Sequence, residues 1–439
     1  GPLVEVRVVC FCLFKYIFHM KLNRRGFLKY GSFASFAFIP SISCNLLNNN
    51  NSALDIFSEI DKALLRPVID KTSIKEPIII QSLELKRYKN NFICEVISTR
   101  GQKGISVGNS DKLQSLWPIF YNRLQPFIIG KDARDLENIL ELIYVYKSNY
   151  KLQNLALWVP WATIEFAILD LIGKVEDKSI GKLIGEIYNP KISVYRANNF
   201  RGKSAEESIE LIKENVFSSQ AKAVKFKIGG RMSKNKDFPI GRSEKLIPLV
   251  RKTFGEDMKI YADSNGSYDV KEAIRLGKIL EEYNYDFYEE PVPFDWYEET
   301  KQVTKSLSVP IAGGEQEASM RNFRWLIGNR ALDIVQPDMF YFGGIIRSIK
   351  VARMANVLEI PCVPHVSGNG LGYLYMMHFV SAIPNAGQFH EFKGFNDQIP
   401  LECSTSKLNI NGGVVKVPTG AGLGVEIDPD FLKKHKVTR

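Results

Sequence analysis

Six acidic or histidine side chains follow one another through the second half of the sequence at nearly constant intervals. The intervals run from 23 to 27 residues, and the positions are Asp263, Glu289, Glu315, Asp338, His365 and Glu391. The first three are carboxylates, and carboxylates that converge repel one another unless a cation lies between them. Hard oxygen ligands of this kind select magnesium or a similar ion. Asp263, Glu289 and Glu315 are therefore predicted to bind one divalent cation.

The rest of the series has the side-chain types needed for proton transfer. A carboxylate next to an imidazole fixes the tautomer of the ring and raises its basicity. Asp338 and His365 are therefore predicted to act together as a general acid/base. Glu391 is predicted to donate a hydrogen bond if it is protonated, while His390 beside it points the other way in a strand.

Two lysines precede the acidic series. Lys225 and Lys227 flank Phe226, and strand alternation would place both ammonium groups on the same, inward side. Burial and like charge both favour loss of a proton, so the pair is expected to have depressed pKa values and to offer a neutral amine as a base. A surface Lys-x-Lys is the alternative, and the position of the pair directly before the acids argues against it.

Short β-rich segments carry these side chains, and helix-length stretches separate the segments. Buried parallel strands are predicted at 192–197, 223–228, 259–265, 286–291, 310–315, 333–338, 360–365 and 388–392. One intervening stretch, 269–283, begins with Asp269 as a helix cap and has apolar residues along one face. A strand, a helix and two turns that repeat about every 25 residues are typical of a (β/α)8 barrel, whose catalytic groups lie at the C-terminal ends of the strands. Residues 191–430 are thus predicted to form a metal-binding barrel domain in an α/β protein.

A second domain is predicted before the barrel. Residues 74–190 contain two alternating runs, 77–86 and 91–99, and a third short strand near 104–107, which together predict a three-stranded meander. Helical stretches follow, the clearest at 160–174. The region is therefore interpreted as a separate α+β unit.

Residues 1–52 are interpreted as an export signal and tether, with Met20 as the expected biological start. The pattern Arg24-Arg25-x-Phe-Leu-Lys resembles a twin-arginine signal, and the apolar stretch after it is too short to span a membrane. An exported protein is predicted, periplasmic or membrane-tethered, or a cytoplasmic one if the signal is not used. Ser41–Cys44 resembles a lipoprotein cleavage box, which leaves lipid attachment at Cys44, ordinary cleavage and no cleavage as alternatives.

Composition excludes some classes of function. The 439 residues are 45% hydrophobic and 24% charged, as in an ordinary soluble globular protein. The net charge of +10 is spread along the chain with no basic run interleaved with aromatic residues, so nucleic acid is not an expected partner. The five histidines form no His-x-His pair, which disfavours a zinc hydrolase.

The combined pattern resembles the mandelate racemase subgroup of the enolase superfamily, over roughly residues 74–430. The motifs that carry the resemblance are Lys-Phe-Lys at 225–227, the three acids, Glu-Glu-Pro at 289–291, Gly-Gly-Glu at 313–315, Pro-Asp at 337–338, His365 and Glu391. The resemblance implies that residues 74–190 form a capping domain, that the three acids bind one Mg²⁺ per subunit and that the subunits form a homo-oligomer. It also implies that Lys227 and His365 are bases on opposite faces of the substrate, with Asp338 as the partner of His365. Lys225 would help to hold the substrate carboxylate, and Glu391 would hydrogen-bond the enediolate.

These residues predict magnesium-dependent abstraction of the proton α to a carboxylate. If protonated His365 then expels a β-hydroxyl as water, the enzyme is an acid-sugar dehydratase, a lyase that converts an aldonate or aldarate to a 2-keto-3-deoxy acid, and this is the preferred interpretation. If the opposite base returns the proton, the enzyme is a racemase or epimerase, with a cycloisomerase as a related alternative. A sugar-acid-binding protein without turnover is the third hypothesis.

Substrate contacts are predicted from position. Tyr195, Arg196 and Asn198 end the first predicted strand, and Asn265 follows Asp263 by two residues, so these four are candidate substrate-binding residues together with Lys225. The interval from Lys227 to Asp263 is longer than the others and contains an enlarged loop at 229–241. That loop either supplies Arg231 or Lys234 to the substrate or is a plain solvated loop.

Overall fold

The computed structural model describes residues 49–367, 371–394 and 399–438. The chain divides into two units, 1–50 and 51–439, and the fold described below is that of the second. The predicted export signal, with Arg24, Arg25 and Cys44, lies outside the described residues. Export and lipid attachment therefore stay predictions.

A parallel sheet in the order β10-β4-β5-β6-β7-β8-β9 is the centre of the larger unit. Its strands are β4 (Lys191–Ala197), β5 (Ala223–Lys227), β6 (Lys259–Asp263), β7 (Phe287–Glu289), β8 (Ile311–Gly313), β9 (Ile334–Val335) and β10 (His390–Phe392). Parallel bridges from Val335 to Cys362 and from Cys362 to Ala386 continue the sheet beyond β9, and β10 pairs with β4. The strands thus curl around into the predicted (β/α)8 barrel, and the fold class is confirmed.

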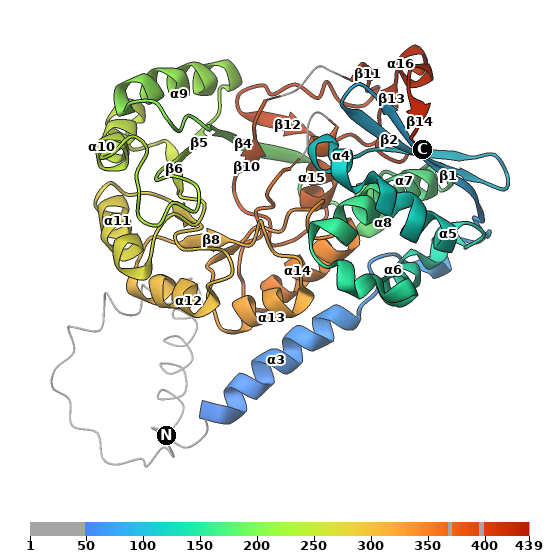
Figure 1. Cartoon of the computed structure of the whole chain (residues 1–439), viewed down its shortest axis with the longest axis horizontal. Coiled ribbons are helices and arrows are strands. Elements are labelled where there is room, and N and C mark those ends of the chain that lie inside the picture. Colours follow the sequence, from blue (N-terminus) through green and yellow to red (C-terminus); the bar gives the residue numbers. More distant parts are fainter. Residues whose placement is uncertain (1–48, 368–370, 395–398, 439) are drawn as a thin grey trace, which may run out of the picture. The chain divides into compact units, whose positions relative to one another are not determined.

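Helices alternate with these strands and surround the barrel (Figure 1). They are α9 (Ala205–Ser219), α10 (Arg242–Phe254), α11 (Val270–Glu282), α12 (Tyr297–Ser306), α13 (Met320–Gly328), α14 (Ile345–Val357) and α15 (Gly372–Ser381). The predicted cap of α11 is present, because the Asp269 side chain accepts a hydrogen bond from the backbone N–H of Glu272. Ala273, Leu276 and Leu280 of α11 are buried, so the helix packs its apolar stripe inward as predicted.

Strand alternation builds two layers of side chains inside the barrel. The deeper layer is a separate buried cluster of Tyr195, Ala223, Tyr261, Phe287, Ala312, Val363 and Phe389. Tyr261 and Phe287 stack in it with their ring centroids 3.9 Å apart. The residue two positions later on a strand points the same way, one step nearer the open end. Asp263 follows Tyr261 and Glu289 follows Phe287 in this manner, so polar side chains lie directly on an apolar floor.

An antiparallel sheet precedes the barrel. It contains the predicted meander, β1 (Ile80–Tyr88), β2 (Asn91–Ser98) and β3 (Lys103–Val107), and also β14 (Lys436–Val437) from the far end of the chain, which pairs with β1. The helices of this region are α4 (Ser110–Ile119), α5 (Gln125–Ile128), α6 (Leu136–Val145), α7 (Leu155–Val175) and α8 (Ile180–Ile184). Among the described helices, α7 is long and apolar enough to cross a membrane, but 89% of its apolar window is buried inside the protein. It packs as a core helix.

Two further segments lie outside the barrel strands and the antiparallel sheet. α3 (Asn49–Leu65) is held to α13, because Arg324 donates to both carboxylate oxygens of Asp61 at 2.6 and 2.7 Å and lies 4.6 Å from the centre of the Phe57 ring. After β10 come β11 (Leu401–Glu402), β12 (Val414–Lys416), β13 (Glu426–Ile427) and α16 (Pro429–Lys433). β12 pairs antiparallel with β4. The domain boundaries predicted from the sequence at 74–190 and 191–430 stay predictions.

Candidate active site

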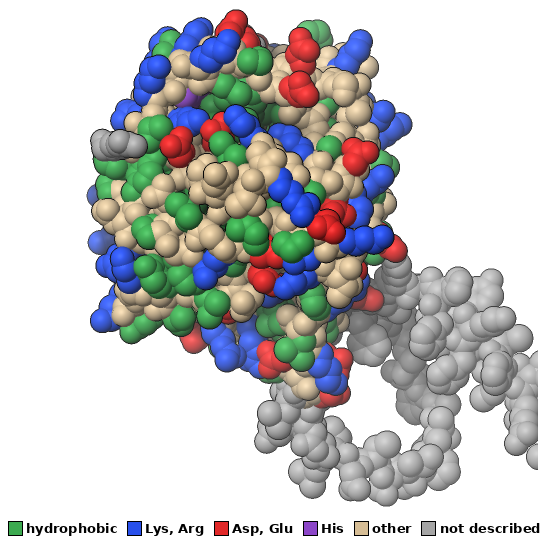
Figure 2. Space-filling model, turned by 90° about the vertical axis from the view of Figure 1, so that its right-hand side faces the viewer, with side chains coloured by type: hydrophobic (Ala, Val, Ile, Leu, Met, Phe, Trp, Pro, Cys, Tyr) green, Lys and Arg blue, Asp and Glu red, His purple; other side chains and the backbone are tan. Residues whose placement is uncertain are grey.

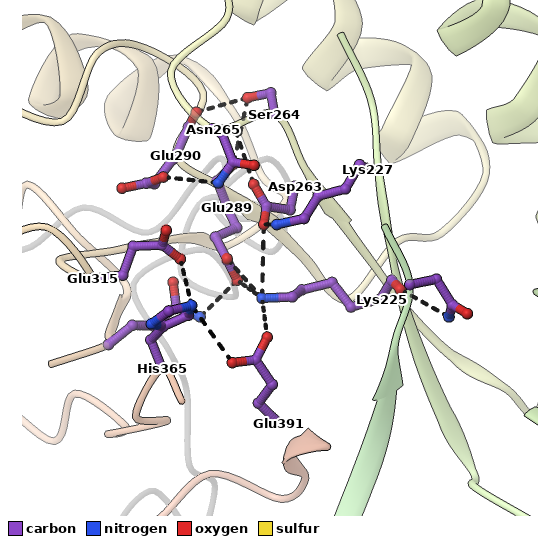
Figure 3. A network of polar contacts seen from close by, with 12 residues as sticks. Lys225, Lys227, Asp263, Ser264, Asn265, Glu289, Glu290, Glu315, His365 and Glu391 are labelled. Atoms are coloured by element: carbon purple, nitrogen blue, oxygen red, sulfur yellow. Dashed lines mark hydrogen bonds and ion pairs between the residues drawn. The ribbon is translucent and has the colours of Figure 1, made fainter. Parts of the chain in front are cut away.

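Three carboxylates meet at the C-terminal ends of neighbouring strands. One oxygen each from Asp263, Glu289 and Glu315 lies within 4.8 Å of the others, and all three side chains are buried. Asp263 and Glu289 are direct partners in the pairing of β6 with β7, so the register of the sheet sets the two side by side. Figure 3 shows the three acids turned toward one another.

The chemistry of this cluster fits a hard divalent cation. The Oε2 atom of Glu315 is buried without a hydrogen-bond partner, as is the Oε1 atom of neighbouring Glu290. Burial and the negative charge of Asp263 raise the pKa of Glu289 well above its usual range, although Lys225 opposes the shift. Buried carboxylate oxygens without donors are costly, and a cation among them removes that cost. Asp263, Glu289 and Glu315 therefore fit the role of metal ligands.

Both lysines of β5 reach this cluster, as strand alternation predicts. The Nζ atom of Lys225 lies 2.7 Å from each carboxylate oxygen of Glu289 and 3.2 Å from Oε1 of Glu391, and Lys227 pairs with Asp263. Burial alone would lower the pKa of Lys225, but Glu289 and Glu391 raise it well above its usual value. The predicted loss of a proton is therefore wrong for Lys225, which is a fixed cation.

His365 and Asp338 form the predicted pair. Nδ1 of His365 lies 2.7 Å from Oδ2 of Asp338, and a parallel bridge joins the two residues. Asp338 also accepts hydrogen bonds from the backbone N–H groups of Phe340, Tyr341 and Ser367, at 2.7 to 2.9 Å. Because the Asp338 carboxylate is a fixed hydrogen-bond acceptor, it favours the imidazole tautomer that has its proton on Nδ1. The other nitrogen, Nε2, lies 3.2 Å from the Lys393 ammonium and 3.5 Å from Oε2 of Glu315, and it is the nitrogen that can exchange protons with a substrate.

Glu391 lies among positive charges that favour its ionised form. Burial alone would raise its pKa, but the positive charges of Lys225, Lys393 and His365 hold that pKa well below its usual range. Its Oε2 atom accepts a hydrogen bond from the backbone N–H of Val366 at 2.9 Å. Glu391 therefore acts as a hydrogen-bond acceptor here, and its donation of a hydrogen bond in a protonated form stays a prediction.

A cavity of about 530 Å³ gives a ligand access to these groups. Lys227 and His365 both line it, and Figure 3 shows the two residues approaching the acids from opposite sides. The region before the barrel also contributes to the lining through Asn109, Ser110 and Asp111. The Nδ2 atom of Asn109 donates a hydrogen bond to Ser367 Oγ at 3.2 Å, which ties this segment to the barrel mouth.

The predicted substrate contacts are only partly brought to this cavity. Arg196 and Asn198 line it, and so does Arg231 of the 229–241 loop, whereas Lys234 is not among its lining residues. Asn198 is already engaged, because it donates to the carbonyl of Arg196 at 3.0 Å and accepts from Asn215 at 2.9 Å.

Tyr195 and Asn265 lie elsewhere. Tyr195 belongs to the apolar floor, where the Lys225 ammonium lies 5.3 Å from the centre of its ring. Ala197 is the inward-facing residue of β4 that lines the cavity. Tyr195 stands two residues earlier on the same side of the strand, so its ring lies one layer below the cavity and does not reach a ligand there. The Asn265 side chain accepts from Arg201 at 3.0 Å and donates to Glu290 at 3.2 Å. Its amide is used in supporting the acids rather than in facing the cavity.

Gln336 and Lys393 contact the catalytic groups and were missed by sequence reasoning. Gln336 donates a hydrogen bond from Nε2 to Glu289 at 2.7 Å, and the Lys393 ammonium lies 3.2 Å from Nε2 of His365. The signal for both was strand alternation. Gln336 stands two residues before Asp338 and Lys393 two residues after Glu391, so each shares the inward side of its strand.

A family model identifies the group of proteins to which this chain belongs. Residues 207–431, just over half of the chain, match the model described as enolase C-terminal domain-like. The chain belongs to this family. Membership agrees with the predicted resemblance to the enolase superfamily.

Known proteins similar to this enolase-like chain include a dehydratase, a cycloisomerase and a mandelate racemase/muconate lactonizing protein. Arabinonate dehydratase of Saccharolobus solfataricus is 28% identical over 318 residues, 71% of this chain and 81% of the relative. D-galactarolactone cycloisomerase of Agrobacterium fabrum is 27% identical over 324 residues, 71% of this chain and 82% of the relative. A solved mandelate racemase/muconate lactonizing protein from Paracoccus denitrificans, complexed with magnesium, shares the fold with a TM-score of 0.74 at 22% identity, covering 82% of this chain and 99% of its own.

Proposed function

We propose that this enolase-like protein removes the proton α to the carboxylate of an acid sugar and then eliminates water from the sugar, as a magnesium-dependent dehydratase. The observation that carries the proposal is the placement of Lys227 and His365, which line one cavity from opposite sides of three converging carboxylates. The similarity to arabinonate dehydratase supports an acid sugar as the substrate class.

Asp263, Glu289 and Glu315 would hold the magnesium ion, and the magnesium complex of the Paracoccus denitrificans protein supports that choice of metal. When bound, the ion supplies positive charge that stabilises the extra negative charge on the substrate carboxylate once the α-proton has left. Lys225 contributes a second, fixed positive charge from the protein itself. Charges that are already in place need no reorganisation during the reaction.

Proton transfer falls to the residues on either side. The α-proton moves to the amine of Lys227 or to Nε2 of His365, depending on the configuration of the sugar. Asp338 holds the Nδ1–H of His365 at 2.7 Å and stabilises the imidazolium that forms on protonation. If His365 took the α-proton, its imidazolium gives that proton to the β-hydroxyl. If Lys227 took it, His365 begins the reaction protonated and gives its own proton. In either case the carbon–oxygen bond breaks and the hydroxyl leaves as water. The enol that remains becomes the 2-keto-3-deoxy acid.

An isomerase is the second candidate, and the similarity to D-galactarolactone cycloisomerase favours it. Two bases on opposite sides of a cavity can also exchange the α-proton without loss of a β-hydroxyl. If one base removes the proton and the other returns one to the opposite face, the product is an epimer of the substrate.

One experiment separates these functions. The purified protein is incubated in D₂O with a panel of aldonates and aldarates, with MgCl₂ or with EDTA. A dehydratase gives a keto acid that can be detected as its semicarbazone, only when magnesium is present. An epimerase gives deuterium at the α-carbon of a sugar acid without any keto acid. Neither product on any acid sugar would overturn both proposals.

A further inference from the structure

One wall of the cavity carries positive charge that the proposed chemistry does not use. On the face drawn in Figure 2, Lys and Arg side chains are scattered among acidic and apolar ones, as on an ordinary solvated surface. The cavity wall differs, because Arg196, Arg231 and Lys393 all line it. Of the lining acids outside the catalytic set, Asp111 is already paired with Lys112 at 2.7 Å.

Arg196 is a half-buried cation with neutral partners. It donates to the carbonyl of Phe392 at 3.4 Å and to Oδ1 of Asn215 at 3.2 Å. Within the described part of the chain, no carboxylate lies within 4.0 Å of its guanidinium nitrogens. Burial lowers its pKa, which reflects the lost hydration of a charge that has no counter-ion. An anionic ligand group would supply that counter-ion.

Lys393 extends the same charge toward the reacting groups. Its ammonium donates to the carbonyl of Val366, lies 3.4 Å from Glu391 and lies 3.2 Å from Nε2 of His365. Glu391 is also shared with Lys225 at 3.2 Å, so one carboxylate serves two ammonium groups. The Lys393 side chain is 46% exposed, and it can therefore turn toward a ligand without opening the core.

The order of the strands sets this wall opposite the acids. Arg196 is the last but one residue of β4, and Lys393 follows β10, the strand next to β4. Glu289 and Glu315 stand on β7 and just beyond β8, across the barrel. Lys227 on β5 and His365, in the segment that bridges β9 and β10, lie between the two walls, one on each side. A sugar whose carboxylate is at the acids and whose α-carbon is between the bases must therefore extend toward Arg196 and Lys393.

We propose that Arg196 and Lys393 form a second anion-binding subsite, which selects acid sugars that carry another negative group at the end remote from the reacting carboxylate. The inference rests on the proposed function and narrows its substrate class. A second carboxylate, as in an aldarate, or a terminal phosphate ester of an aldonate has the required charge, and a simple aldonate does not. A guanidinium and an ammonium recognise either group through charge-assisted hydrogen bonds.

Binding to a protein that cannot turn over its ligand tests the subsite. In a background that lacks both bases, Lys227→Met with His365→Asn, and with MgCl₂ present, isothermal titration calorimetry compares galactarate with galactonate, and glucarate and 6-phosphogluconate with gluconate. The dianion of at least one set is expected to bind about tenfold or more tightly than its matched monoanion, as one charge-assisted contact implies. The dianion with the larger ratio of affinities over its monoanion shows whether the subsite binds a second carboxylate or a terminal phosphate.

Two substitutions, with one control, test whether the preference for the dianion comes from Arg196 and Lys393. Adding Lys393→Met or Arg196→Gln should each reduce the dianion-to-monoanion ratio at least fivefold, and circular dichroism verifies that the variants are folded. Lys203→Met removes an exposed charge outside the cavity lining and should leave the ratio unchanged, so a general loss of electrostatic attraction is controlled. Ratios near one in every set, or ratios that neither substitution changes, would overturn the subsite. If the protein prefers the dianion but forms no product from any acid sugar, the subsite is supported and the dehydratase is rejected. If the protein dehydrates an acid sugar but shows no preference for the dianion, the dehydratase is supported and the subsite is rejected.

Discussion

At the scale of single residues, two glutamates two positions apart show how partners decide the role of a buried charge. Glu315 and Glu317 are both 3% exposed. Glu317 is satisfied within the protein, because it accepts hydrogen bonds from Tyr297 at 2.7 Å and from Asn322 at 2.9 Å. Glu315 keeps one oxygen without a hydrogen-bond partner beside two other carboxylates. The first arrangement is structural, and the second is one that a cation completes.

This contrast predicts opposite responses to magnesium. Magnesium should raise the midpoint of thermal unfolding of the unmodified protein, because a ligand at a hundred times its Kd adds about 2.7 kcal/mol to the free energy of unfolding. Glu315→Gln should lose most of that rise while keeping or raising the midpoint without metal, because it removes one charge from a repulsive group. Differential scanning fluorimetry with MgCl₂ and with EDTA measures both effects. Glu317→Gln is the matched control and should keep the magnesium response; an unchanged response in Glu315→Gln would remove that residue from the metal site.

Asp338 is predicted to act on the reaction only through His365. In Asp338→Asn the amide can present its N–H to Nδ1 of His365, which would leave the imidazole proton on Nε2, where the base is needed. We expect kcat to fall by about 100-fold or more with a smaller change in KM, which steady-state kinetics on the substrate found by screening can measure. Asp286→Asn is a suitable comparison, since Asp286 accepts hydrogen bonds from Lys259 and from the backbone of Ile260 at the other end of the strands. A similar loss of kcat in both variants would mean that Asp338 matters only for folding.

At the scale of elements, strand register explains why the acids could be predicted from their spacing. Asp263 and Glu289, 26 residues apart, are partners across β6 and β7. Lys227 is the partner of Asp263 across β5 and β6, although the enlarged loop at 229–241 lengthens that interval. A repeat of constant length in a parallel barrel returns the chain to the same height at each strand, so residues a repeat apart become neighbours. Glu315 lies beyond the end of β8, after Gly314 with a φ of +110°, and it is this turn that brings its carboxylate to the group.

Spacing alone was insufficient to predict the roles of Tyr195, Gln336 and Lys225. Tyr195 was placed at the mouth from its position near a strand end, but two-residue alternation puts it on the floor below. Gln336 was overlooked because an amide inside an apolar run carries no charge pattern, although it donates to Glu289. The pKa of Lys225 was misjudged for a different reason. Its shift depends on Glu289 and Glu391, which are distant in sequence and which only the folded barrel brings within 3.2 Å.

The junction between α10 and β5 depends on one buried arginine. Arg242 donates to the carbonyl of Lys227 at 2.8 Å, to the carbonyl of Phe200 at 3.1 Å and to Ser208 Oγ at 3.1 Å. Arg242→Met should lower the free energy of unfolding by about 3 kcal/mol or more, because it leaves buried carbonyl groups without donors. Urea unfolding followed by fluorescence measures the change. Arg275→Met should cost less than about 1 kcal/mol, since Arg275 pairs with Glu244 and Glu272 at the surface; equal losses in the two variants would contradict the proposed importance of the junction.

At the scale of the whole molecule, the region before the barrel, the barrel and the C-terminal segment are joined by buried polar contacts. The Tyr375 hydroxyl of α15 receives a hydrogen bond from the backbone of Val107 at 2.8 Å, and Asp170 of α7 accepts one from the backbone of Leu423 at 2.8 Å. These pairs are more than 250 residues apart in sequence and follow no period, so sequence patterns could not predict them. They position the segment that contains Asn109 at the cavity, and the site therefore depends on the packing of the complete unit.

Two buried titratable groups in these interfaces have pKa shifts in opposite directions. His378 on α15 accepts a hydrogen bond at Nδ1 from the backbone N–H of Gly181 at 3.3 Å and donates from Nε2 to the carbonyl of Leu423 at 3.0 Å. Burial lowers its pKa to about 4. Glu165 on α7 accepts from the backbone N–H of Ile346 at 3.0 Å, and burial raises its pKa to about 7. Both groups are thus neutral in the folded protein over part of the range between pH 4 and 7.

These shifts predict how stability changes with acidity. Between pH 6.5 and 4 the unfolded chain holds a proton on His378 and the folded chain does not, so the contribution of His378 is complete above pH 6.5 and falls by about 3 kcal/mol as the pH drops to 4. For Glu165 the folded form holds the extra proton between pH 4.5 and 7, so its contribution to stability is complete below pH 4.5 and is lost as the pH rises to 7.

Urea unfolding of the unmodified protein, His378→Gln and Glu165→Gln across this pH range isolates each group, because the other titrating residues cancel in the differences. The free energy of unfolding of His378→Gln should fall less than that of the unmodified protein on acidification, and that of Glu165→Gln should fall more; parallel curves for all three proteins would show that neither group titrates as the buried contacts require.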